Sequence, residues 1–412
     1  MQTDEHVGLS MQEVALAKIK AGHNVFVTGG AGVGKTFVIN QLKDDKTLLL
    51  APTGIAALNI GGMTVSRAFK IPTGPVKLKD YKAHAPLRKM FKSGDVTRVL
   101  IDEAGMLEAQ SLDLIDSKLR HCTGVEAPFG GVQVVLVGDM YQLAPIPNKY
   151  PYERYNTPYC FGARSWKFET VALTKVYRQE DTRQQAILSS IRSGDRNSGR
   201  ALSVIQAEAR KYDPTQEQTH LCCYKVDAAR QNKVKFNQLD GLATNYRGVR
   251  SNLKDTWKDC TVEVDLSLKL GAKVVIKTND PEGEWVNGDT GHVSMMGKDF
   301  VSIKLLRGGV VVNIPPYTWE RTQIGADGSE EVIGTFTQIP VVLGYAITGH
   351  SSQGMTLENV AIDVGDRGCF SCGQLYVLLS RVKDLRNLSF IRTISKRDLK
   401  VSNDVKLFYD NL

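Results

Sequence analysis

Apolar and amphipathic segments alternate along roughly the first 180 residues, in the manner of buried strands joined by helices. Segments with an apolar centre, which are typical of buried strands or their exits, occupy residues 24–28, 48–53, 96–106, 132–139 and 169–178. Segments of this kind are typical of parallel strands that are covered on both faces. The pattern therefore predicts an α/β domain built on a parallel sheet.

The alternation is interrupted and then resumes. Residues 71–95 are rich in proline and lysine, which indicates an insertion at the edge of the sheet. Residues 219–239 have the pattern of a strand followed by a helix, and residues 344–365 that of strand, loop and strand, so we expect a second α/β unit. Between these segments, residues 250–338 carry short alternating strands separated by glycine-containing turns, which predicts a small inserted β-barrel.

Length and composition indicate a globular protein of more than one domain. A chain of 412 residues is too long for a single ordinary core. Its 42% hydrophobic and 23% charged residues are ordinary for a globular protein, and no apolar stretch is long enough to cross a bilayer. Residues 1–13 are acidic and polar, without the pattern of a secretion signal or a transit peptide, so we expect a cytoplasmic protein of a bacterium or a virus.

The net charge indicates a class of partner, and the cysteine content indicates the state of the thiols. The net charge of +8 favours an anionic partner such as nucleic acid, although charge alone does not identify one. The seven cysteines are scattered and odd in number, which is typical of reduced thiols. Cys369 and Cys372 have the spacing of metal ligands, but without a second pair or nearby histidines we interpret them as ordinary thiols.

Residues 29–36, GGAGVGKT, directly follow an apolar run and have the composition of a phosphate-binding loop. A strand that ends in a glycine-rich turn and opens a helix directs backbone N–H groups at one point, where the helix dipole adds positive potential. Gly29 and Gly34 allow the tight wrap, and Lys35 reaches the outer phosphates. The Thr36 hydroxyl is placed to ligate magnesium. The sequence thus predicts a site for a nucleoside triphosphate and Mg²⁺.

Polar residues beyond this loop are candidates to complete the site. Asp102 and Glu103 end an apolar strand, where the first can hold magnesium through its water shell and the second can polarise the attacking water. Gln142 follows the next strand and can hydrogen-bond the γ-phosphate or the lytic water. Arg178 and Arg381 could neutralise charge on the transferred phosphoryl group, although either could instead form a surface ion pair.

Taken together, these motifs resemble helicase superfamily one, and within it the Pif-type (petite integration frequency) DNA helicases, which are relatives of RecD. The PFGG element joined to the GDxxQL strand, and the GQLYVxLSR stretch, are more specific to this branch than the phosphate loop is. The matching stretches span nearly the whole chain, and they are residues 9–12 (LSMQ), 29–36 (GGAGVGKT), 51–69 (APTGIAALNIGGMTVSRAF), 100–106 (LIDEAGM), 128–146 (PFGGVQVVLVGDMYQLAPI), 173–181 (LTKVYRQED), 346–357 (AITGHSSQGMTL) and 373–382 (GQLYVLLSRV).

The resemblance implies an ATP site and a path for single-stranded DNA, with a role for each matching residue. Gln12 would read the adenine, Thr36 and Asp102 would hold Mg²⁺, and the remaining roles follow the motifs. The catalytic set would be Glu103, Gln142, Arg178 and Arg381, and the nucleotide would also contact Gly29, Gly30, Ala31, Gly32, Val33, Gly34 and Lys35. The DNA path would be lined by Thr53, Gly54, Thr64 and Phe69 in the first domain and by Thr348, His350, Ser352 and Thr356 in the second.

The resemblance also implies a fold and an activity. The fold would be α/β, with a first RecA-like P-loop domain over residues 1–183, a wedge insertion at about 70–95, a second RecA-like domain over 184–250 and 339–412, and an SH3-like β-barrel over 251–338. The activity would be that of a monomeric, ATP-driven helicase that moves 5′ to 3′ on single-stranded DNA and acts at junctions of single-stranded and duplex DNA. Two alternatives stay open: a DNA-stimulated ATPase or recombination subunit that does not unwind, and a DNA-binding module with a decayed motor.

Four positions depart from the family pattern. Gly105 stands where a serine is usual, Ser66 replaces a common histidine, and Leu378 replaces an alanine. Ser351 replaces the usual lysine after His350. Loss of that lysine removes one phosphate contact, so we expect it to affect the grip on DNA more than ATP hydrolysis.

Overall fold

The computed structural model describes residues 9–72, 76–146, 154–177, 181–251, 262–324, 330–353 and 355–412. The chain divides into two compact units with separate hydrophobic cores. Unit 1 comprises Met1–Gln185, Thr322–Glu331 and Val401–Leu412, and unit 2 comprises Ala186–Arg321 and Val332–Lys400. Among the residues described, no helix combines the length and the apolar content needed to cross a membrane.

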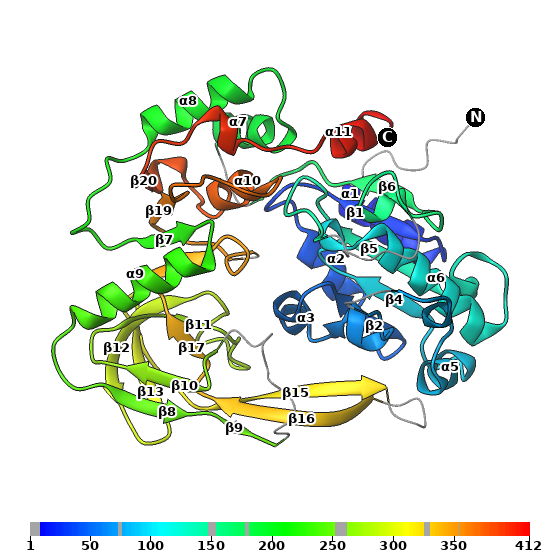
Figure 1. Cartoon of the computed structure of the whole chain (residues 1–412), viewed down its shortest axis with the longest axis horizontal. Helices are drawn as coiled ribbons and strands as arrows, with labels where there is room; N and C mark the ends of the chain where they lie inside the picture. Colours follow the sequence, from blue (N-terminus) through cyan, green and yellow to red (C-terminus); the bar gives the residue numbers. More distant parts are fainter. Residues whose placement is uncertain are drawn as a thin grey trace. The chain divides into compact units, whose positions relative to one another are not determined.

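Unit 1 is built on a six-stranded sheet in the order β3-β2-β4-β5-β1-β6, and each pair of neighbours is parallel (Figure 1). All six strands therefore direct their carboxyl ends to the same edge of the sheet. β5 lies between β1 and β4, so the ends of these three strands follow one another along that edge. The strands are β1 Val25–Thr28, β2 Thr47–Ala51, β3 Met63–Thr64, β4 Arg98–Ile101, β5 Gln133–Gly138 and β6 Glu169–Ala172.

Helices cover both faces of this sheet because successive strand residues are apolar and point to opposite sides. Phe26 of β1 packs with residues of α5, α6 and α11, while its neighbours Val25 and Val27 pack with residues of α1, α2 and α3. The helices are α1 Met11–Lys20, α2 Lys35–Gln41, α3 Gly54–Ile60, α4 Val65–Ala68, α5 Ala85–Lys92, α6 Ala109–Thr123 and α11 Asn403–Asp410, with 3₁₀ turns η1 Leu78–Tyr81, η2 Ala104–Met106, η3 Pro128–Gly131 and η4 Cys160–Gly162. The predicted parallel α/β architecture of this part of the chain is confirmed.

The segment expected as an insertion at the sheet edge, residues 71–95, contributes residues to the core of unit 1. Within it, α5 packs against α6, and Leu87, Met90 and Phe91 are buried in the same cluster as the strands. Residues 73–75 of the segment lie outside the described part. The wedge function of this segment stays a prediction.

Unit 2 contains a second parallel sheet, in the order β18-β7-β19-β20. The predicted strand and helix at residues 219–239 are β7 Thr219–Cys222 and α9 Lys225–Asn237. The predicted strand, loop and strand at residues 344–365 are β18 Ala346–Thr348 and β19 Val360–Asp363. The remaining elements of this α/β part are α7 Thr182–Ser193, which begins in unit 1, α8 Ser198–Glu208, α10 Gln374–Leu379, η5 Leu385–Asn387, β20 Leu388–Phe390 and η6 Lys396–Asp398.

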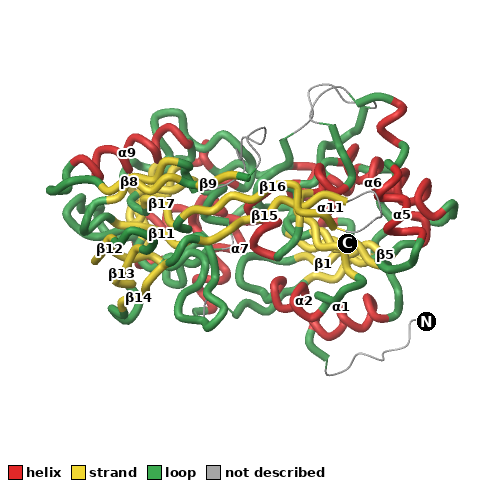
Figure 2. Tube along the Cα trace, turned by 90° about the horizontal axis from the view of Figure 1, so that it is seen from below, coloured by secondary structure: helices red, strands yellow, loops and turns green. Residues whose placement is uncertain are grey.

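Short antiparallel strands form the rest of unit 2, as expected for an inserted β structure. A five-stranded sheet, β14-β13-β12-β11-β17, and the pair β10-β8 share one hydrophobic core, and Figure 2 shows these strands gathered in one block. This core begins at β8 and ends at β17, so it is wider than the expected range 251–338. The strands are β8 Thr244–Arg247, β10 Asp265–Leu268, β11 Lys273–Ile276, β12 Thr290–Met296, β13 Val301–Leu305, β14 Val311–Ile314 and β17 Val341–Leu343.

Three strands between these elements form a separate sheet with its own small core. β15 Tyr317–Ile324 and β16 Glu330–Gln338 lie side by side as a long ribbon, and β16 also pairs with β9 Val249–Arg250 (Figure 1). Trp319 stacks on Phe336, and both pack with Val262. The turn pattern of the sequence predicted strands here but not their separation from the larger β core.

Candidate functional site

The glycine-rich loop connects the end of β1 to the start of α2. Gly34 caps α2 with φ of 87°, in the left-handed region that favours glycine. At Gly29, a Cβ atom would lie 2.5 Å from the carbonyl oxygen of Leu173, so any side chain there would force the loop away from β6. The two glycines named from sequence are thus required by the backbone of this loop.

Two predicted nucleotide-binding side chains lie directly against the loop. Lys35 Nζ donates hydrogen bonds to the carbonyl oxygens of Gly29 and Gly30, each at 2.7 Å. The buried amide of Gln12, near the start of α1, donates to the carbonyl of Val33 at 2.9 Å. Helix α1 is fixed at this point by a capping box, which orients Gln12 toward the loop. The structure therefore brings together side chains that are 23 positions apart in the sequence.

The acidic pair follows β4 at the same edge of the sheet. The backbone N–H of Glu103 donates to Asp102 Oδ1 at 2.8 Å, so the first carboxylate is held by the second residue of the pair. Burial raises the pKa of Asp102, while that N–H and the positive charges of Lys35 and Lys43 oppose the shift. Glu103 has φ of 51°, which is unusual for a residue with a side chain and is a strained conformation.

Gln142 lies just beyond β5, the strand between the loop strand and the acidic strand. Asp139 Oδ1 accepts from the backbone N–H of Tyr141 at 3.1 Å, and its Oδ2 accepts from Gln142 Nε2 at 3.3 Å. Asp139 and Gln142 are buried, with 1% and 6% of their surface exposed. The amide predicted to contact the γ-phosphate is therefore held in one orientation by a neighbouring carboxylate.

Gly105, one of the departures from the family pattern, has a steric cause. A Cβ atom at this position would lie 2.6 Å from the carbonyl oxygen of Asp139. Gly138 has the reciprocal constraint, since its Cβ would lie 2.7 Å from the backbone nitrogen of Ala104. Backbone packs against backbone here, which fixes the turn after β4 to the end of β5.

The two predicted arginines are placed differently. Arg178 lies outside the described residues. Arg381, in unit 2 just after α10, is 2% exposed and donates from Nε to the carbonyl of Val377 at 2.8 Å. Its other nitrogens donate to the carbonyl of Ser352 at 3.1 Å and to Ser380 Oγ at 2.8 Å. In this structure its guanidinium is held by groups of unit 2, and a role at the phosphates stays a prediction.

Three of the predicted DNA contacts of unit 1 lie at the carboxyl ends of β2 and β3. The Thr53 hydroxyl accepts from the N–H of Ala56, and the Thr64 hydroxyl accepts from the N–H of Arg67, each at 3.3 Å. Gly54 begins α3, so the two threonines sit where helices start. Phe69 differs from the expectation because its side chain has no exposed surface and packs in the core. A fully buried ring cannot contact DNA in this structure.

The predicted DNA contacts of unit 2 lie in the loop after β18. Thr348 and Ser352 are buried, and they hold the loop: Thr348 Oγ1 lies 3.0 Å from Ser351 Oγ, and Ser352 Oγ donates to the carbonyl of Gly349 at 2.8 Å. Thr356 is exposed. In this structure the hydroxyls of Thr348 and Ser352 therefore stabilise the loop, and of these three residues only Thr356 is exposed.

His350 lies in an aromatic cluster that the sequence did not reveal. Its ring is nearly parallel to that of Phe370, with centroids 6.3 Å apart, and Phe370 also contacts the ring of Tyr224 at 5.1 Å. The guanidinium of Arg367 lies 3.8 Å from the centroid of Tyr224. Burial, followed by the charge of Lys225, lowers the pKa of His350, which favours the neutral imidazole. Phe370 is 51% exposed, and its place beside the loop of His350 depends on tertiary contacts that the sequence does not show.

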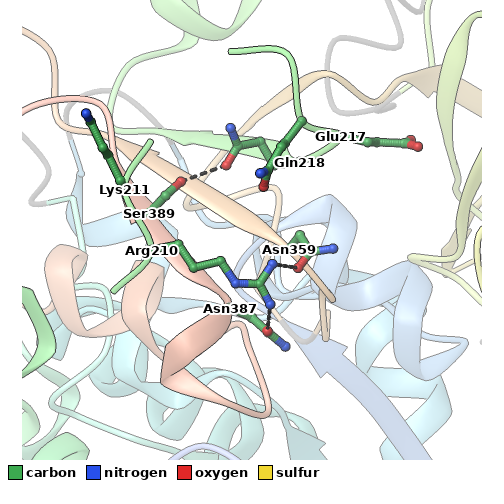
Figure 3. Close-up of a pocket in the computed structure, with 8 residues that line it drawn as sticks. Arg210, Lys211, Glu217, Gln218, Asn359, Asn387 and Ser389 are labelled. Atoms are coloured by element: carbon green, nitrogen blue, oxygen red, sulfur yellow. Dashed lines mark hydrogen bonds between the residues drawn. The ribbon is translucent and has the colours of Figure 1, made fainter. Parts of the chain in front are cut away.

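A polar pocket of about 230 Å³ lies at the amino ends of the unit 2 strands, at the opposite edge of that sheet from the Thr348 loop (Figure 3). The guanidinium of Arg210 donates to Asn359 Oδ1 at 3.1 Å and to Asn387 Oδ1 at 2.5 Å, just before β19 and β20. Ser389 Oγ donates to Gln218 Oε1 at 2.7 Å. These contacts tie three strand starts together, and the pocket contains none of the predicted site residues. Its lining is Arg210, Lys211, Gln216, Glu217, Gln218, Asn359, Asn387 and Ser389.

Known proteins share both the sequence and the fold of this chain. A model of the PIF1-like helicase family matches residues 8–192. The ATP-dependent DNA helicase Pif1 of Bdellovibrio bacteriovorus is 30% identical over 412 residues, covering 97% of this chain and 90% of the relative. The ATP-dependent DNA helicase PIF1 of Homo sapiens is 32% identical, but this chain spans only 59% of its length.

Solved structures agree with this relationship. Pif1 from Bacteroides sp. in complex with ADP-AlF4 is 31% identical and matches with a TM-score of 0.84, covering 100% of this chain and 97% of that one. Bacteroides Pif1 bound to ssDNA matches with a TM-score of 0.70 at 31% identity, covering 99% and 97% of the two chains. A sequence identity of 30% over 90% of a bacterial relative, a common α/β fold and the motif residues at one sheet edge show that this chain belongs to the Pif1 family of ATP-dependent DNA helicases.

Proposed function

We propose that this chain hydrolyses ATP to move 5′ to 3′ along single-stranded DNA and to unwind duplex DNA ahead of it. The observation that carries the proposal is the edge of the unit 1 sheet, where the phosphate loop, the acidic pair and Gln142 follow three neighbouring strands. Ligands of open α/β sheets bind at the carboxyl ends of the strands. The polarity and the junction preference come from the family resemblance.

In the proposed mechanism, the loop and Lys35 bind the phosphates of ATP while Gln12 contacts the adenine. Glu103 orients and polarises the water that attacks the γ-phosphorus, and Gln142 hydrogen-bonds the γ-phosphate. The donor set fits Mg²⁺, since the Thr36 hydroxyl and the Asp102 carboxylate are hard oxygen ligands. When bound there, the ion would neutralise charge on the phosphate oxygens.

Arg178 and Arg381 are proposed to neutralise the charge that develops on the transferred phosphoryl group. For Arg381 this role requires the guanidinium to exchange hydrogen bonds within unit 2 for bonds to phosphate oxygens. Backbone carbonyls and a hydroxyl are among its present partners, and an anionic phosphate is a stronger hydrogen-bond acceptor than these uncharged groups.

The DNA grip is proposed to alternate between the two units. Thr53, Gly54 and Thr64 would hold the strand in unit 1, and the loop with His350 and Thr356 would hold it in unit 2. Hydroxyls, backbone amides and a neutral imidazole bind phosphate without reading sequence, and the exposed ring of Phe370 adds a surface on which a base can stack. Bacteroides Pif1 binds ssDNA, and two coordinating Pif1 helicases of known structure unwind DNA at forked dsDNA, which supports this choice of partner.

The finer architecture belongs to the same proposal. We propose that the two units are RecA-like domains, with bounds close to the expected residues 1–183 for the first and 184–250 with 339–412 for the second, except that residues 401–412 pack with the first unit. The inserted β structure would be an SH3-like barrel over about residues 251–338, and residues 70–95 would supply a wedge. A parallel sheet in each unit supports the first assignment, and the shared core of β8 to β14 and β17 supports the second.

Strand displacement with the purified chain tests the proposed activity. A duplex with a 5′ single-stranded overhang should be unwound in the presence of ATP and Mg²⁺, while a matched 3′-overhang duplex and a blunt duplex should not. Hydrolysis of ATP that is stimulated by ssDNA but displaces no strand would support the alternative of a DNA-stimulated ATPase, and displacement only from a 3′ overhang would contradict the polarity.

Two substitutions separate binding from chemistry. Lys35→Ala should abolish hydrolysis and leave the affinity for ssDNA within about threefold, because the lysine contacts phosphates of the nucleotide. Glu103→Gln should still bind ATP but hydrolyse it roughly 10² to 10⁴ times more slowly, as expected for loss of a general base. Lys46→Ala, in an exposed turn before β2, is the matched control and should hydrolyse ATP like the unchanged chain. Full activity of Glu103→Gln would remove that residue from the mechanism.

A further inference from the structure

Helix α11 places Tyr409 at the ends of two strands that carry the ATP site. The Tyr409 hydroxyl lies 2.5 Å from Thr28 Oγ1 and accepts a hydrogen bond from the backbone N–H of Met140 at 3.3 Å. Thr28 is the last residue of β1, directly before the phosphate loop, and Met140 lies two residues before Gln142. A single hydroxyl therefore joins the loop strand to the strand that carries Gln142.

The direction of the hydrogen bond with Met140 follows from its chemistry. A backbone N–H can only donate, so the phenol oxygen must be the acceptor for Met140. Between the Tyr409 and Thr28 hydroxyls either group can be the donor, and in both cases the bond requires both oxygens. Thr28 is fully buried and Met140 is 1% exposed, so loss of the hydroxyl would remove hydrogen bonds in a place that water reaches poorly.

Ring stacking extends the contact toward Gln142. The ring of Tyr409 is stacked on that of Tyr141 with centroids 4.7 Å apart and an angle of 10° between the planes. Tyr141 directly precedes Gln142, and both residues are hydrogen-bonded to Asp139. The turn that carries the Gln142 amide is thus held by Asp139 on one side and by Tyr409 on the other.

The neighbouring Phe408 fixes α11 in this position. Its ring stacks on Phe161 with centroids 4.4 Å apart and meets Trp166 edge-on at 5.6 Å. It also contacts Phe26 of β1 at 6.2 Å. Because this aromatic cluster anchors the helix, the hydroxyl of Tyr409 is held at a defined point relative to β1 and β5.

We propose that Tyr409 is a positioning residue for ATP hydrolysis. Its hydroxyl sets the spacing between the start of the phosphate loop and the turn that carries Gln142, and it acts through these two groups without touching the nucleotide. The proposal rests on the assignment of Gln142 to the γ-phosphate made above. Displacements of a fraction of an ångström at such groups are enough to slow a reaction markedly while leaving substrate binding intact.

Tyr409→Phe removes the hydroxyl and keeps the stacked ring. Amide hydrogen exchange at Met140 should become roughly tenfold faster, because the N–H loses its acceptor. The kcat of ssDNA-stimulated ATP hydrolysis should fall roughly tenfold, with the KM for ATP changed less than twofold. Thr28→Val removes only the hydrogen bond between the two hydroxyls, so it should also lower kcat but leave exchange at Met140 unchanged. Adding Thr28→Val to Tyr409→Phe should lower kcat little further, because Tyr409→Phe already removes that bond.

Tyr155→Phe is the matched control. Tyr155 also donates a hydroxyl hydrogen bond inside unit 1, to Asp113 Oδ2 at 2.9 Å, but no motif residue of the ATP site takes part in that bond. This variant should keep the exchange rate of Met140 and the kcat of the unchanged chain, which separates a positioning effect from a general loss of stability.

Each result decides the inference. Unchanged exchange at Met140 in Tyr409→Phe, or faster exchange with an unchanged kcat, would refute the positioning role. Gln142→Ala measured beside it should lose kcat; if it does not, the assignment of Gln142 fails whatever Tyr409→Phe does. An unchanged chain without ssDNA-stimulated hydrolysis would refute the proposed function, and the positioning role with it.

Discussion

Two residues that depart from the family pattern have local steric explanations. Gly105 has no room for a side chain because of the carbonyl of Asp139. Leu378 is fully buried, and its Cδ2 would lie 3.0 Å from a Cβ atom at Gly349 in the loop after β18. The larger side chain at 378 therefore packs against that loop. Nothing in the structure explains the exposed Ser66.

Ser351 is the departure with a predicted effect on DNA binding. Ser351→Lys should tighten binding of ssDNA at low salt and steepen its salt dependence by about 0.7 in log–log slope, because one added cation neutralises one phosphate. The measurement is the dissociation constant for a fluorescent oligonucleotide across a salt series. Ser351→Met controls for the loss of the contact with Thr348 and should leave the slope unchanged. An unchanged slope in Ser351→Lys would place position 351 away from the strand.

Local motifs made most of the candidate site predictable at the level of residues. Gly29, Gly34 and Lys35 belong to one short motif. The order of a strand, a glycine-rich turn and a helix determines that they lie in the phosphate loop. Tyr409 had no such signal, because it is 381 positions from the threonine that it contacts. The burial of Phe69 was missed for a related reason: a motif gives the residue type but not the direction of its side chain.

At the level of elements, segments with an apolar centre were the reliable signal. Each segment predicted as a strand of the first domain overlaps one, and the interior strands β1, β4 and β5 are buried on both faces, as parallel strands usually are. Helix α5 was missed although Leu87, Met90 and Phe91 have the i, i+3, i+4 spacing of a buried helical face. The proline and lysine residues around this helix obscure its periodicity in the sequence. The division of the β strands between two cores depends on tertiary contacts that no local pattern contains.

Strand β7 carries a histidine that predicts how unit 2 responds to acid. His220 is 6% exposed, and mainly because of this burial its pKa is lowered from 6.5 to about 4. The charges of Lys235 and Lys273 lower the pKa further, whereas the charge of Asp363 raises it. The unfolded chain therefore binds the proton more tightly than the folded one. Unit 2 should lose stability as the pH falls from 6.5 to about 4, by about 3 kcal/mol in total.

Denaturant unfolding at pH 7 and pH 4.5, with exchange in β7 as the local probe, measures this effect. His220→Gln should reduce the loss of stability between the two pH values, because glutamine does not take up a proton. His84, in unit 1, has its pKa lowered to about 4 mainly by burial, so His84→Gln is the matched control and should leave the acid response of β7 unchanged. An unaltered acid response of β7 in His220→Gln would contradict the prediction.

At the level of the whole molecule, residues 401–412 belong to unit 1, whereas the sequence placed them in the second α/β domain. The reason is the apolar face of α11: Val405 is 1% exposed, and Phe408 enters the aromatic cluster around Trp166. The family resemblance had assigned these residues, together with β20, to the second domain. The buried face of α11 instead packs in unit 1, and this packing cannot be predicted from the distance between the residues in the sequence.

Phe408→Ala tests this assignment. Removing a partly buried aromatic ring should destabilise unit 1 by about 3 kcal/mol. Amide exchange should accelerate in β1 and β5 and stay the same in β7 and β19. Leu407 lies on the same helix and is 61% exposed, so Leu407→Ala should change the stability of unit 1 little. Equal acceleration in both units would show that α11 does not stabilise unit 1 selectively.

The position of α11 has a consequence for synthesis on the ribosome. Contacts between Thr28 and Tyr409, which are 381 positions apart, cannot form until Tyr409 has been translated. Until then, the residues of unit 1 that pack against Phe408 lack this partner. Closing so distant a contact is also slow compared with local helix formation. During that interval the apolar surface around Phe161 and Trp166 is a natural target for chaperones, and the catalytic turn is not held in place until the helix has docked.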